Sequence, residues 1–399
     1  MEKVSVARFY MTPGANQLVL PNSIGVESEC SVEFVTGRDE VLRLSRQLME
    51  FSARCGQAGA MHDIAYFLSK PGALPRTPHL LLVSRTSGPN LRGRDFNHLL
   101  GLLLIFEQRM LGMGTGTFAT NDRSGRGALI AKPSDRSRVV ALTSRALLDR
   151  GARLILMSFR DEDGSTGRSS AMQLPLLEAG AHSRGVARWA RRERTIPGYL
   201  PLLGTFDATL AKIGQRTRSN LRYYRRRAES RLGCVFVPRI EVSREDMLAF
   251  NSQCMYAAPA EVAGWRYDSL SELSDPVFMG LKDREGRWLS MLGGRRYEGR
   301  SELLWQLNRS GFAADSLGTV MRSYFIEHEI AHGSRRLYIE GGTPHPIKFS
   351  FVPEYLTDLV VVRRTLGAKV MRMVARRYIS RGNELSHMLG AKDLEWQPC

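Results

Sequence analysis

The sequence predicts an α/β (α+β) protein with two tandem domains, and three observations lead to this fold class. The chain has 399 residues, 43% of them hydrophobic, which is enough for two separate cores. Short strand-like runs alternate with amphipathic, helix-like segments along the chain. The order strand, helix, strands, helix, strand occurs in the first half and again in the second. Two domains of the same kind are the simplest account of this repetition.

In the first half, residues up to about 30 are expected to form an arm with a few strand residues, bounded by Pro13-Gly14 and Pro21-Asn22. The polar segments Arg160 to Arg168 and Gly180 to Arg194 are expected to be loops. Strands are expected at Ser31 to Val35, His79 to Arg85, Leu99 to Phe106 and Ala152 to Phe159, and helices at Asp39 to Ala53 and Pro133 to Leu148.

The second half repeats this order, and the predicted domain boundaries follow from it. We expect an N-terminal arm at 1–30, a first domain at 31–200, a second domain at 201–385 and a C-terminal tail at 386–399. The repeating segments of the second domain are Cys234 to Pro238, Ser243 to Tyr256, Val277 to Lys282, Leu289 to Tyr297, Ser301 to Leu307, the helix from Ser316 and the strand Arg336 to Glu340.

The helix that begins near Ser316 is predicted from its apolar spacing. Its apolar face consists of Leu317, Met321, Tyr324, His328 and Ala331, at intervals of three and four residues. Asp315 or Ser316 can cap it. Ser316, Leu317, Gly318 and Thr319 form its opening, where Gly318 would let a ligand approach unsatisfied backbone N–H groups. Such a helix N-terminus suits phosphate.

The strand that follows this helix ends in Glu340-Gly341-Gly342. A strand, a helix and a second strand together place Glu340 near the helix N-terminus, where open α/β sheets usually bind their substrates. Asn308, at the end of the preceding strand, can present its amide to a ligand at the same place.

Three segments resemble the GNAT acyltransferase superfamily, and more closely its branch of cellulose-biosynthesis-type acetyltransferases and Fem-type aminoacyl transferases. They are the basic helix Leu210 to Gly233, the small-residue opening Ser316 to Met321, and Ile339-Glu340-Gly341-Gly342 followed by Ile347-Lys348-Phe349. The resemblance implies two tandem GNAT-like domains, each a mixed, mostly antiparallel sheet flanked by helices. It also implies acyl-CoA as a co-substrate, with no cofactor bound permanently.

The sequence departs from the family pattern at the start of the donor helix. Many members that bind acetyl-CoA carry Gln/Arg-x-x-Gly-x-Gly/Ala there, whereas this chain has only Gly318. A better formal match, Arg123 to Ala128, invites a second donor site in the first domain. Pro133 opposes it, because a proline inside a helix costs roughly 3 kcal/mol. A hairpin turn at Gly125 to Gly127 with a strand at Ala128 to Ala131 accounts for the segment instead.

The net charge of +17 predicts attraction to polyanions such as CoA, tRNA, nucleic acid or an anionic membrane surface. The basic helix concentrates part of this charge, since it carries eight Lys and Arg residues against the single acid Glu229. A solvated helix face is one interpretation of this pattern, and a surface that binds phosphates is the other. The residues assigned to polyanion binding are Arg222, Arg225, Arg226 and Arg227.

Acyl transfer to an amine requires a base, a donor clamp and stabilisation of an oxyanion, and three residues are candidates for the chemistry. Glu340 could act as the base, or form an ion pair with Arg335, Arg336 or Lys348. Lys348 could neutralise phosphate or developing charge, or be a surface lysine. Tyr338 faces the same side of its strand as Glu340 and could be an acid, or a core tyrosine.

His328 and His332 have the spacing of metal ligands, but no third ligand accompanies them, so no metal site is expected. The five cysteines show no paired or metal-binding spacing, and no apolar run reaches the roughly 18 residues of a membrane span. A cytoplasmic protein with reduced thiols is expected.

Three functions are compatible with the sequence. They are an acyl-CoA-dependent N-acyltransferase, a Fem-like transferase that uses aminoacyl-tRNA, and a non-catalytic GNAT-fold module that binds nucleic acid or an acidic partner.

Overall fold

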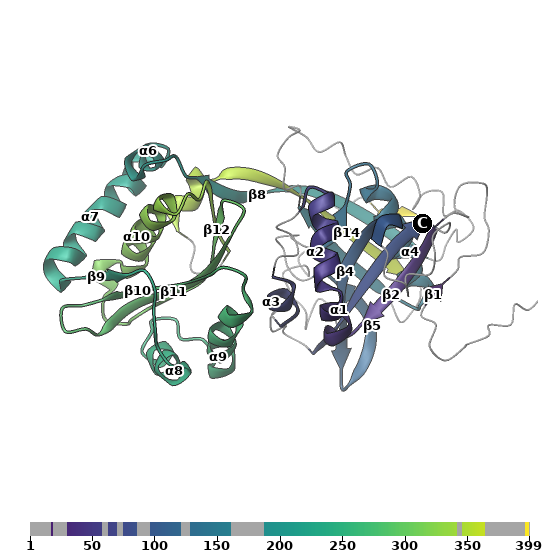
Figure 1. Ribbon diagram of the computed structural model, residues 1–399, viewed down its shortest axis with the longest axis horizontal. Helices are drawn as coiled ribbons and strands as arrows, with labels where there is room; N and C mark the ends of the chain where they lie inside the picture. The colour runs from purple at the N-terminus through teal and green to yellow at the C-terminus, as the bar shows by residue number, and fades with distance from the viewer. Residues whose placement is uncertain are drawn as a thin grey trace, which may run out of the picture.

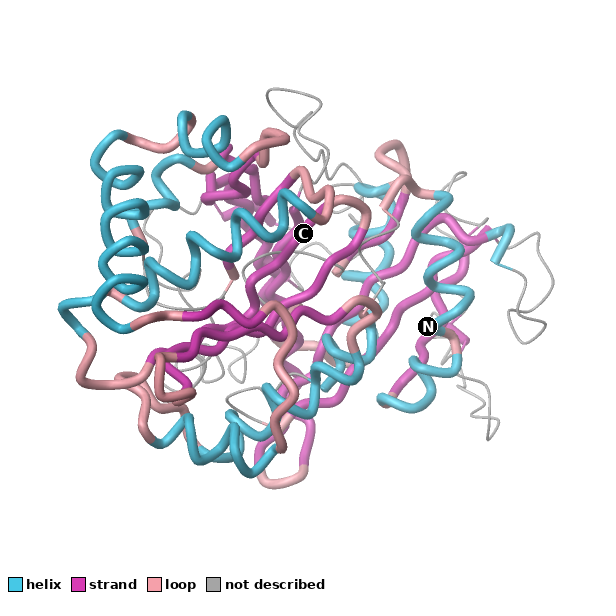
Figure 2. Tube along the Cα trace, turned by 60° about the vertical axis from the view of Figure 1, so that its left-hand side comes forward, coloured by secondary structure: helices cyan, strands magenta, loops and turns pink. Residues whose placement is uncertain are grey.

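Two α/β units share one long mixed sheet in the computed structural model of the protein (Figure 1). The structure describes residues 17–18, 30–57, 63–69, 75–85, 96–120, 128–160, 187–340, 345–363 and 396–398. Viewed from another side, the strands of both units run as one twisted band with helices packed around it (Figure 2). In the described part of the chain, no helix combines the length and the apolar character required to cross a bilayer.

The first unit comprises the elements up to β7. They are β1 (Gln17–Leu18), β2 (Cys30–Thr36), α1 (Arg38–Arg43), α2 (Ser45–Arg54), α3 (Ile64–Ser69), β3 (Arg76–Arg85), the 3₁₀ turn η3 (Phe96–His98), β4 (Leu99–Met110), β5 (Met113–Ala119), β6 (Leu129–Ala131), α4 (Arg136–Asp149) and β7 (Leu154–Arg160).

The second unit follows β8 (Ala187–Pro201), a strand that belongs to both units. Its elements are α6 (Phe206–Ala211), α7 (Gln215–Leu232), β9 (Val235–Val237), α8 (Arg244–Ser252), α9 (Ala260–Asp268), η5 (Ser269–Glu272), β10 (Pro276–Lys282), β11 (Trp288–Tyr297), β12 (Arg300–Asn308), η6 (Ala313–Asp315), α10 (Leu317–Ala331), β13 (Arg336–Ile339) and η7 (Pro346–Ser350). The strands β14 (Val352–Arg363) and β15 (Trp396–Pro398) come last.

The two units repeat one topology. In each, a strand is followed by helices, three antiparallel strands, a helix, and a strand that lies parallel to the last of the three. The parallel pairs are β5 with β7 around α4, and β12 with β13 around α10. The resemblance to GNAT acyltransferases implied two tandem domains of mixed, mostly antiparallel sheet flanked by helices, and this fold prediction is confirmed.

The strand order of the long sheet shows how the units are joined. It runs β1-β2-β3-β4-β5-β7-β14-β8-β13-β12-β11-β10-β9, with β6 beside β4 and β15 beside β8. The strand β8 pairs with β14 along most of its length, and then with β13 through Leu200 and Pro201. The strand β14 lies inside the range predicted for the second domain, yet it pairs with β7 of the first unit from Leu356 to Val362.

The prediction of a loop at Gly180 to Arg194 was wrong for the described residues, because Ala187 to Arg194 form the first part of β8. The arginines that indicated a loop face acids on the neighbouring strand instead. Arg194 Nε donates to Asp358 at 2.7 Å and Arg192 donates to the same carboxylate at 3.2 Å, with Asp358 fully buried. Such pairing across the sheet is invisible in sequence, because the partner is more than 160 residues away.

Two helices predicted as continuous are each divided in the structure. Leu44 separates α1 from α2, and Lys212 to Gly214 separate α6 from α7. The helix expected from Pro133 begins at Arg136. The strands β5 and β14 and the helix α9 were not predicted. The turn at 125–127 lies outside the described residues, as do most of the predicted arm and tail.

A buried arginine of β11 makes one of the contacts between the units. Arg295 donates to Asp63 of the first unit at 2.6 Å and to Glu302 of β12 at 2.8 Å, and all three side chains are buried. Asp63 also accepts from the backbone N–H of Ser274 at 2.6 Å. Burial alone would lower the pKa of Arg295, but the charges of Glu302 and Asp63, together with Tyr297, raise it. The guanidinium of Arg295 therefore stays charged, and it links Asp63, the residue before α3, to β11 and β12 of the second unit.

We expect Arg295→Ala to lower the free energy of unfolding by about 3–5 kcal/mol, because it leaves two buried carboxylates without their cation. Urea unfolding followed by circular dichroism measures this change. The matched control is Arg46→Ala, which breaks an exposed pair with Glu50 and should cost less than about 1 kcal/mol. Equal stability losses in the two variants would contradict the role given to Arg295.

Candidate functional site

The N-terminus of α10 has an unusual backbone. Ser316, its N-cap residue, lies in the left-handed region with φ of 51°, which non-glycine residues rarely adopt. The carbonyl of Ser316 accepts from the N–H groups of Thr319 at 2.7 Å and Val320 at 3.2 Å. No described residue accepts from the N–H groups of Leu317 and Gly318. Two backbone donors therefore remain available at the positive end of a 15-residue helix.

Side chains at the end of β12 lie against this helix start. A Cβ built on Gly318 would be 3.4 Å from Asn308 Nδ2 and 3.8 Å from Gln306 Nε2, so the glycine leaves room for no more than a small group there. Asn308 Oδ1 accepts from Ser290 Oγ at 2.9 Å and from Gln306 Nε2 at 3.0 Å. These bonds orient the amide of Asn308 with its NH₂ group toward Gly318.

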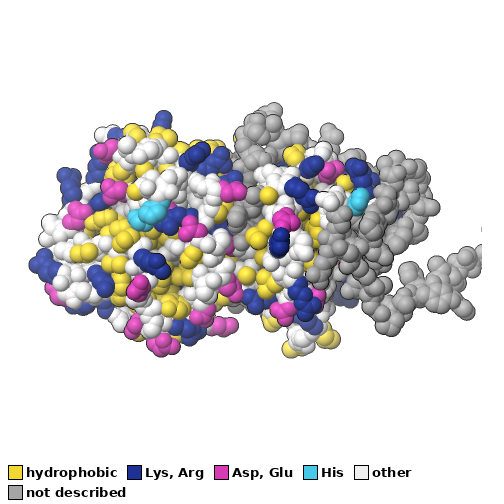
Figure 3. Space-filling model, viewed as in Figure 1, with side chains coloured by type: hydrophobic (Ala, Val, Ile, Leu, Met, Phe, Trp, Pro, Cys, Tyr) yellow, Lys and Arg dark blue, Asp and Glu magenta, His cyan; other side chains and the backbone are white. Residues whose placement is uncertain are grey.

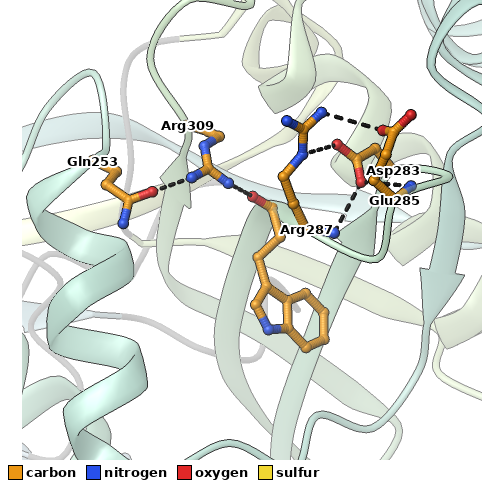
Figure 4. A network of polar contacts seen from close by, with 6 residues as sticks. Gln253, Asp283, Glu285, Arg287 and Arg309 are labelled. Atoms are coloured by element: carbon orange, nitrogen blue, oxygen red, sulfur yellow. Dashed lines mark hydrogen bonds and ion pairs between the residues drawn. The ribbon is translucent and has the colours of Figure 1, made fainter.

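A second polar network surrounds Arg309, the residue that follows Asn308 at the end of β12. Figure 4 shows Arg309 donating to the side chain of Gln253 and to the backbone oxygen of Trp288, the latter at 3.0 Å. Beside it, Asp283 accepts from the backbone N–H of Arg287 at 2.9 Å and from its side chain at 2.8 Å, which fixes the turn between β10 and β11. The first of these contacts thus holds the end of β12 to the start of β11 and to α8.

A chain of hydrogen bonds runs from His345 to Ser316. The Nδ1 atom of His345 accepts from the backbone N–H of Ile347 at 3.2 Å, so a neutral His345 carries its proton on Nε2. That Nε2 lies 3.1 Å from Thr319 Oγ1, which lies 3.1 Å from Ser316 Oγ. Each hydroxyl can then donate to the next, and the Ser316 hydroxyl can donate onward to a ligand at the helix start.

Burial and the nearby Arg322 lower the pKa of His345 to about 4. His345 is therefore neutral at pH 7, as required for the series of hydrogen bonds that runs from His345 through Thr319 to Ser316. Burial also lowers the pKa of Arg322 to about 10, so this arginine remains charged. It lies one turn along α10 from Gly318 and adds positive potential behind the helix start.

The parallel strands β12 and β13 separate beside this helix. Their pairing runs from Arg300 and Arg336 to Leu303 and Ile339, and the N–H of Glu340 donates to the carbonyl of Leu303 at 2.9 Å. The strand β12 then continues to Asn308, and in the described residues no strand pairs with this last segment on its β13 side. Free backbone groups of a strand edge can pair with an extended ligand.

Glu340 lies where the two strands separate. Its side chain is 34% exposed, and Oε1 lies 3.6 Å from Nη1 of the buried Arg160. Lys348 lies in η7, where it is half-buried and its N–H donates to the carbonyl of His345 at 3.0 Å. Glu340 and Lys348 therefore lie on the two sides of residues 341–344, which are outside the described part of the chain. One ion pair of Glu340 is with Arg160, a partner that sequence reasoning did not consider.

Tyr338 is buried with 1% of its surface exposed, and its hydroxyl donates to Glu354 Oε1 of β14 at 3.0 Å. Arg160 also binds Glu354, and its guanidinium lies 5.2 Å from the centre of the Tyr338 ring. The Tyr338 hydroxyl is thus directed at β14. This geometry suits a residue that positions Arg160 and Glu340 better than it suits the acid considered from sequence.

The arginines predicted to bind polyanions lie on α7, and most of them have acidic partners. Arg222 pairs with Asp207 at 2.7 Å and Arg225 with Glu327 at 2.7 Å. Arg226 donates to the backbone carbonyl of Arg222 at 3.4 Å. The pair of Arg225 with Glu327 clamps α7 to α10, and Arg227 extends this clamp to Asp315 of η6.

This clamp is centred on Asp315, which is fully buried directly before the start of α10. Arg227 Nε lies 3.3 Å from Asp315 Oδ1, and Arg231 Nη2 lies 2.7 Å from Oδ2. Two cations on one carboxylate leave a net positive charge next to the helix start. The structure therefore gives part of the basic helix a role in fixing the candidate site.

Sequence reasoning missed several residues of this site. His345 and Arg322 were not considered, although a histidine shortly after a Gly-Gly strand end and an arginine on an apolar helix face are visible signals. Arg160 and Glu354 could not have been found, because they meet only through the pairing of β7 with β14. In the described residues no group of three or more His, Cys, Asp or Glu side chains could hold a metal ion, and the rings of His328 and His332 lie 4.0 Å apart.

Comparisons with known proteins relate the chain to solved structures only. No protein-family model matches it, and no curated protein matches it in sequence. A FemX crystal structure is 12% identical with a TM-score of 0.48 over 78% of this chain and 97% of that one. A tandem GNAT protein from the clavulanic acid biosynthesis pathway is 12% identical with a TM-score of 0.45 over 83% of this chain and 98% of that one.

An L-PGS structure from Bacillus licheniformis is also 12% identical, with a TM-score of 0.47 over 84% of this chain and 96% of that one. Similarity at this level transfers no activity, so the GNAT-like fold is taken from the repeated topology described above.

We expect the stability of the protein to fall as the pH is lowered from 6.5 toward 4, in part through His345. Its pKa in the folded state is below its ordinary value, so in this range the unfolded chain binds a proton that the folded chain does not. Urea unfolding at pH 7 and pH 5 measures the loss. His345→Asn, which can still accept from Ile347, should show a smaller loss, since the remaining groups titrate in both proteins. An identical pH dependence in the variant would refute this assignment.

Proposed function

We propose that the protein is an N-acyltransferase that uses acyl-CoA as donor, with its site at the start of α10. The observation that carries the proposal is the start of α10 at the left-handed Ser316, which no side chain caps, so that the N–H groups of Leu317 and Gly318 are free at a helix N-terminus. Phosphate groups bind well at such a position. Arg322 and the cationic cluster around Asp315 add to this positive field.

The free edge of β12 supplies the second part of a donor site. CoA carries two amide groups in its extended arm, and these could pair with the backbone of β12 between Leu303 and Asn308 in the manner of an added strand. The separation of β12 from β13 directs such an arm from the helix start toward Glu340. Asn308 and Gln306 contribute side-chain amides along the same path. Gln306 Oε1 is buried and has no hydrogen-bond partner among the described residues, so an amide N–H of the donor would satisfy it.

Transfer then requires the nitrogen of the acceptor amine to attack the thioester carbon. A C–N bond forms, the C–S bond breaks, and the thiolate leaves and takes up a proton. Glu340 is proposed to accept the proton of the amine, directly or through a water molecule, and the buried Arg160 orients its carboxylate. Lys348 is proposed to neutralise donor phosphate or the charge that develops on the carbonyl oxygen.

A second candidate keeps the fold and replaces the donor by aminoacyl-tRNA. The net charge of +17 favours it, as does Arg226, for which the described residues include no acidic partner. The ion pairs of Arg222 and Arg225 count against it, because a nucleic acid would have to displace their acidic partners. A non-catalytic GNAT-fold module that binds nucleic acid or an acidic partner is the third possibility, and the experiments below distinguish all three.

We expect CoA, acetyl-CoA or a long-chain acyl-CoA to raise the thermal unfolding temperature of the protein. A ligand at about a hundred times its dissociation constant stabilises the native state by roughly 2.7 kcal/mol. Gly318→Glu should abolish this shift, because it places a bulky negative side chain at the helix start. The control Gly318→Ala should fold normally, because its Cβ meets only ordinary contacts. A shift produced by charged tRNA alone, and weakened by salt, would favour the second candidate. The absence of any shift would favour the third.

We expect Glu340→Gln to lower the rate of acyl transfer by about 10²–10⁴-fold while leaving the CoA-induced thermal shift unchanged, because the amide cannot accept a proton from the amine. Release of free thiol from acyl-CoA, in the presence of a panel of amines, measures the rate. The comparison variant is Glu327→Gln, an exposed acid of α10 that pairs with Arg225. Full activity in Glu340→Gln would remove this residue from the mechanism.

A further inference from the structure

The hairpin between β4 and β5 presents apolar side chains to solvent. Leu111 and Gly112 form its two-residue turn, and Met110 pairs with Met113 directly behind it. The exposed fractions are 48% for Met110, 91% for Leu111 and 69% for Met113. The hairpin projects below the rest of the first unit in Figure 1, and hydrophobic side chains cover its tip in Figure 3.

Leu111 is an unfavourable residue for the turn position that it occupies. Both turn residues have positive φ, 52° for Leu111 and 79° for Gly112, which is the pattern of a type I′ turn. The first position of this turn prefers Asn, Asp or Gly, because other side chains are strained there. A leucine that is also almost fully exposed gains nothing from packing in the folded chain. An interaction outside the chain would account for it.

The strand and helix ends behind the hairpin are strongly basic. Backbone hydrogen bonds connect them, since the N–H of Arg109 donates to Pro75 at 2.8 Å and the N–H of Arg363 donates to Arg153 at 3.0 Å. The acids on the described part of these ends are Glu107, which faces His79, Asp149, and Asp39 and Glu40 in the first turn of α1. The cations outnumber them; they are Arg76, Arg109, Arg150, Arg153 and Arg363.

The spacing between the apolar tip and this basic layer matches a membrane surface. Thr117 of β5 pairs with Leu154 of β7. The residues that precede them, Gly116 and Arg153, therefore lie at the same level of the sheet. Gly116 is three residue steps along the strand from Met113, which corresponds to about 10 Å. Amphipathic helices that lie at a membrane surface bury their apolar face about 5–10 Å into the boundary between headgroups and acyl chains, and we take this depth for the hairpin tip. With the tip at that depth, the arginines would lie among the headgroups.

We propose that this end of the first unit docks on a bilayer that contains anionic lipids, with Met110, Leu111 and Met113 inserted at the interface. A bilayer fits the tip better than a protein partner does. A stable protein interface buries about 800 Å² on each side, and the turn of one hairpin cannot supply that area. A fluid bilayer requires no complementary shape, and its negative charge complements the arginines. The inference does not depend on the reaction proposed above.

Flotation of the full-length protein with lipid vesicles tests this inference. Vesicles of phosphatidylcholine with about one third phosphatidylglycerol are compared with vesicles of phosphatidylcholine alone, in low and moderate salt. We expect binding to the anionic vesicles only, and weaker binding as salt is added. Leu111→Asn should reduce that binding at least tenfold without lowering thermal stability, because asparagine suits the turn. Met113→Thr, which retains a strand-forming residue, should reduce it as well.

The matched control is Val235→Thr, which removes an exposed apolar residue from β9 at the opposite edge of the long sheet. Its binding should equal that of the unmodified protein. Three results would overturn the inference. The first is an absence of binding to anionic vesicles. The second is equal binding by Leu111→Asn, Met113→Thr and the unmodified protein, which would place the contact on another basic surface such as α7. The third is an equal loss in Val235→Thr.

Discussion

The strand β8 is the element on which the arrangement of both units depends. It pairs with β14 from Ala187 onward and with β13 through Leu200 and Pro201, so one strand joins the strands of the two units into a single sheet. Two of its arginines depend on this arrangement, because Arg192 and Arg194 share the buried Asp358. A strand so rich in arginine would be a poor sheet former alone, and the buried acid makes its position specific.

The candidate site is held in position by residues of both units. Arg160 ends β7 and Glu354 lies near the start of β14, so the residues that orient Glu340 come from the first sheet, while α10 belongs to the second unit. On the other side, Arg227 and Arg231 hold Asp315 and fix α10 against α7. Ion pairs that each contain one buried member, Asp315 or Arg160, thus position the helix start and the candidate base from opposite sides. A preorganised site needs such support.

The fold could be predicted largely from local patterns, because apolar periodicity is a local property. The run Leu99 to Phe106 and the face of Leu317 and Met321 identify a strand and a helix without any distant partner. The strand β8 could not be recognised, since its charges are neutralised by residues of a strand that follows much later. The same holds for the site. The opening at Gly318 follows from helix capping, whereas the contact of Glu340 with Arg160 exists only through the sheet topology.

The position of β14 has a consequence for the order in which the protein folds during synthesis. The strands β9 to β13 and the helices between them are contiguous in the chain, so the core of the second unit can form as soon as it leaves the ribosome. The first sheet cannot close between β7 and β8 until Val352–Arg363 has been made. The domain that is translated first is therefore completed last, and its open strand edges are exposed to misassembly throughout that interval.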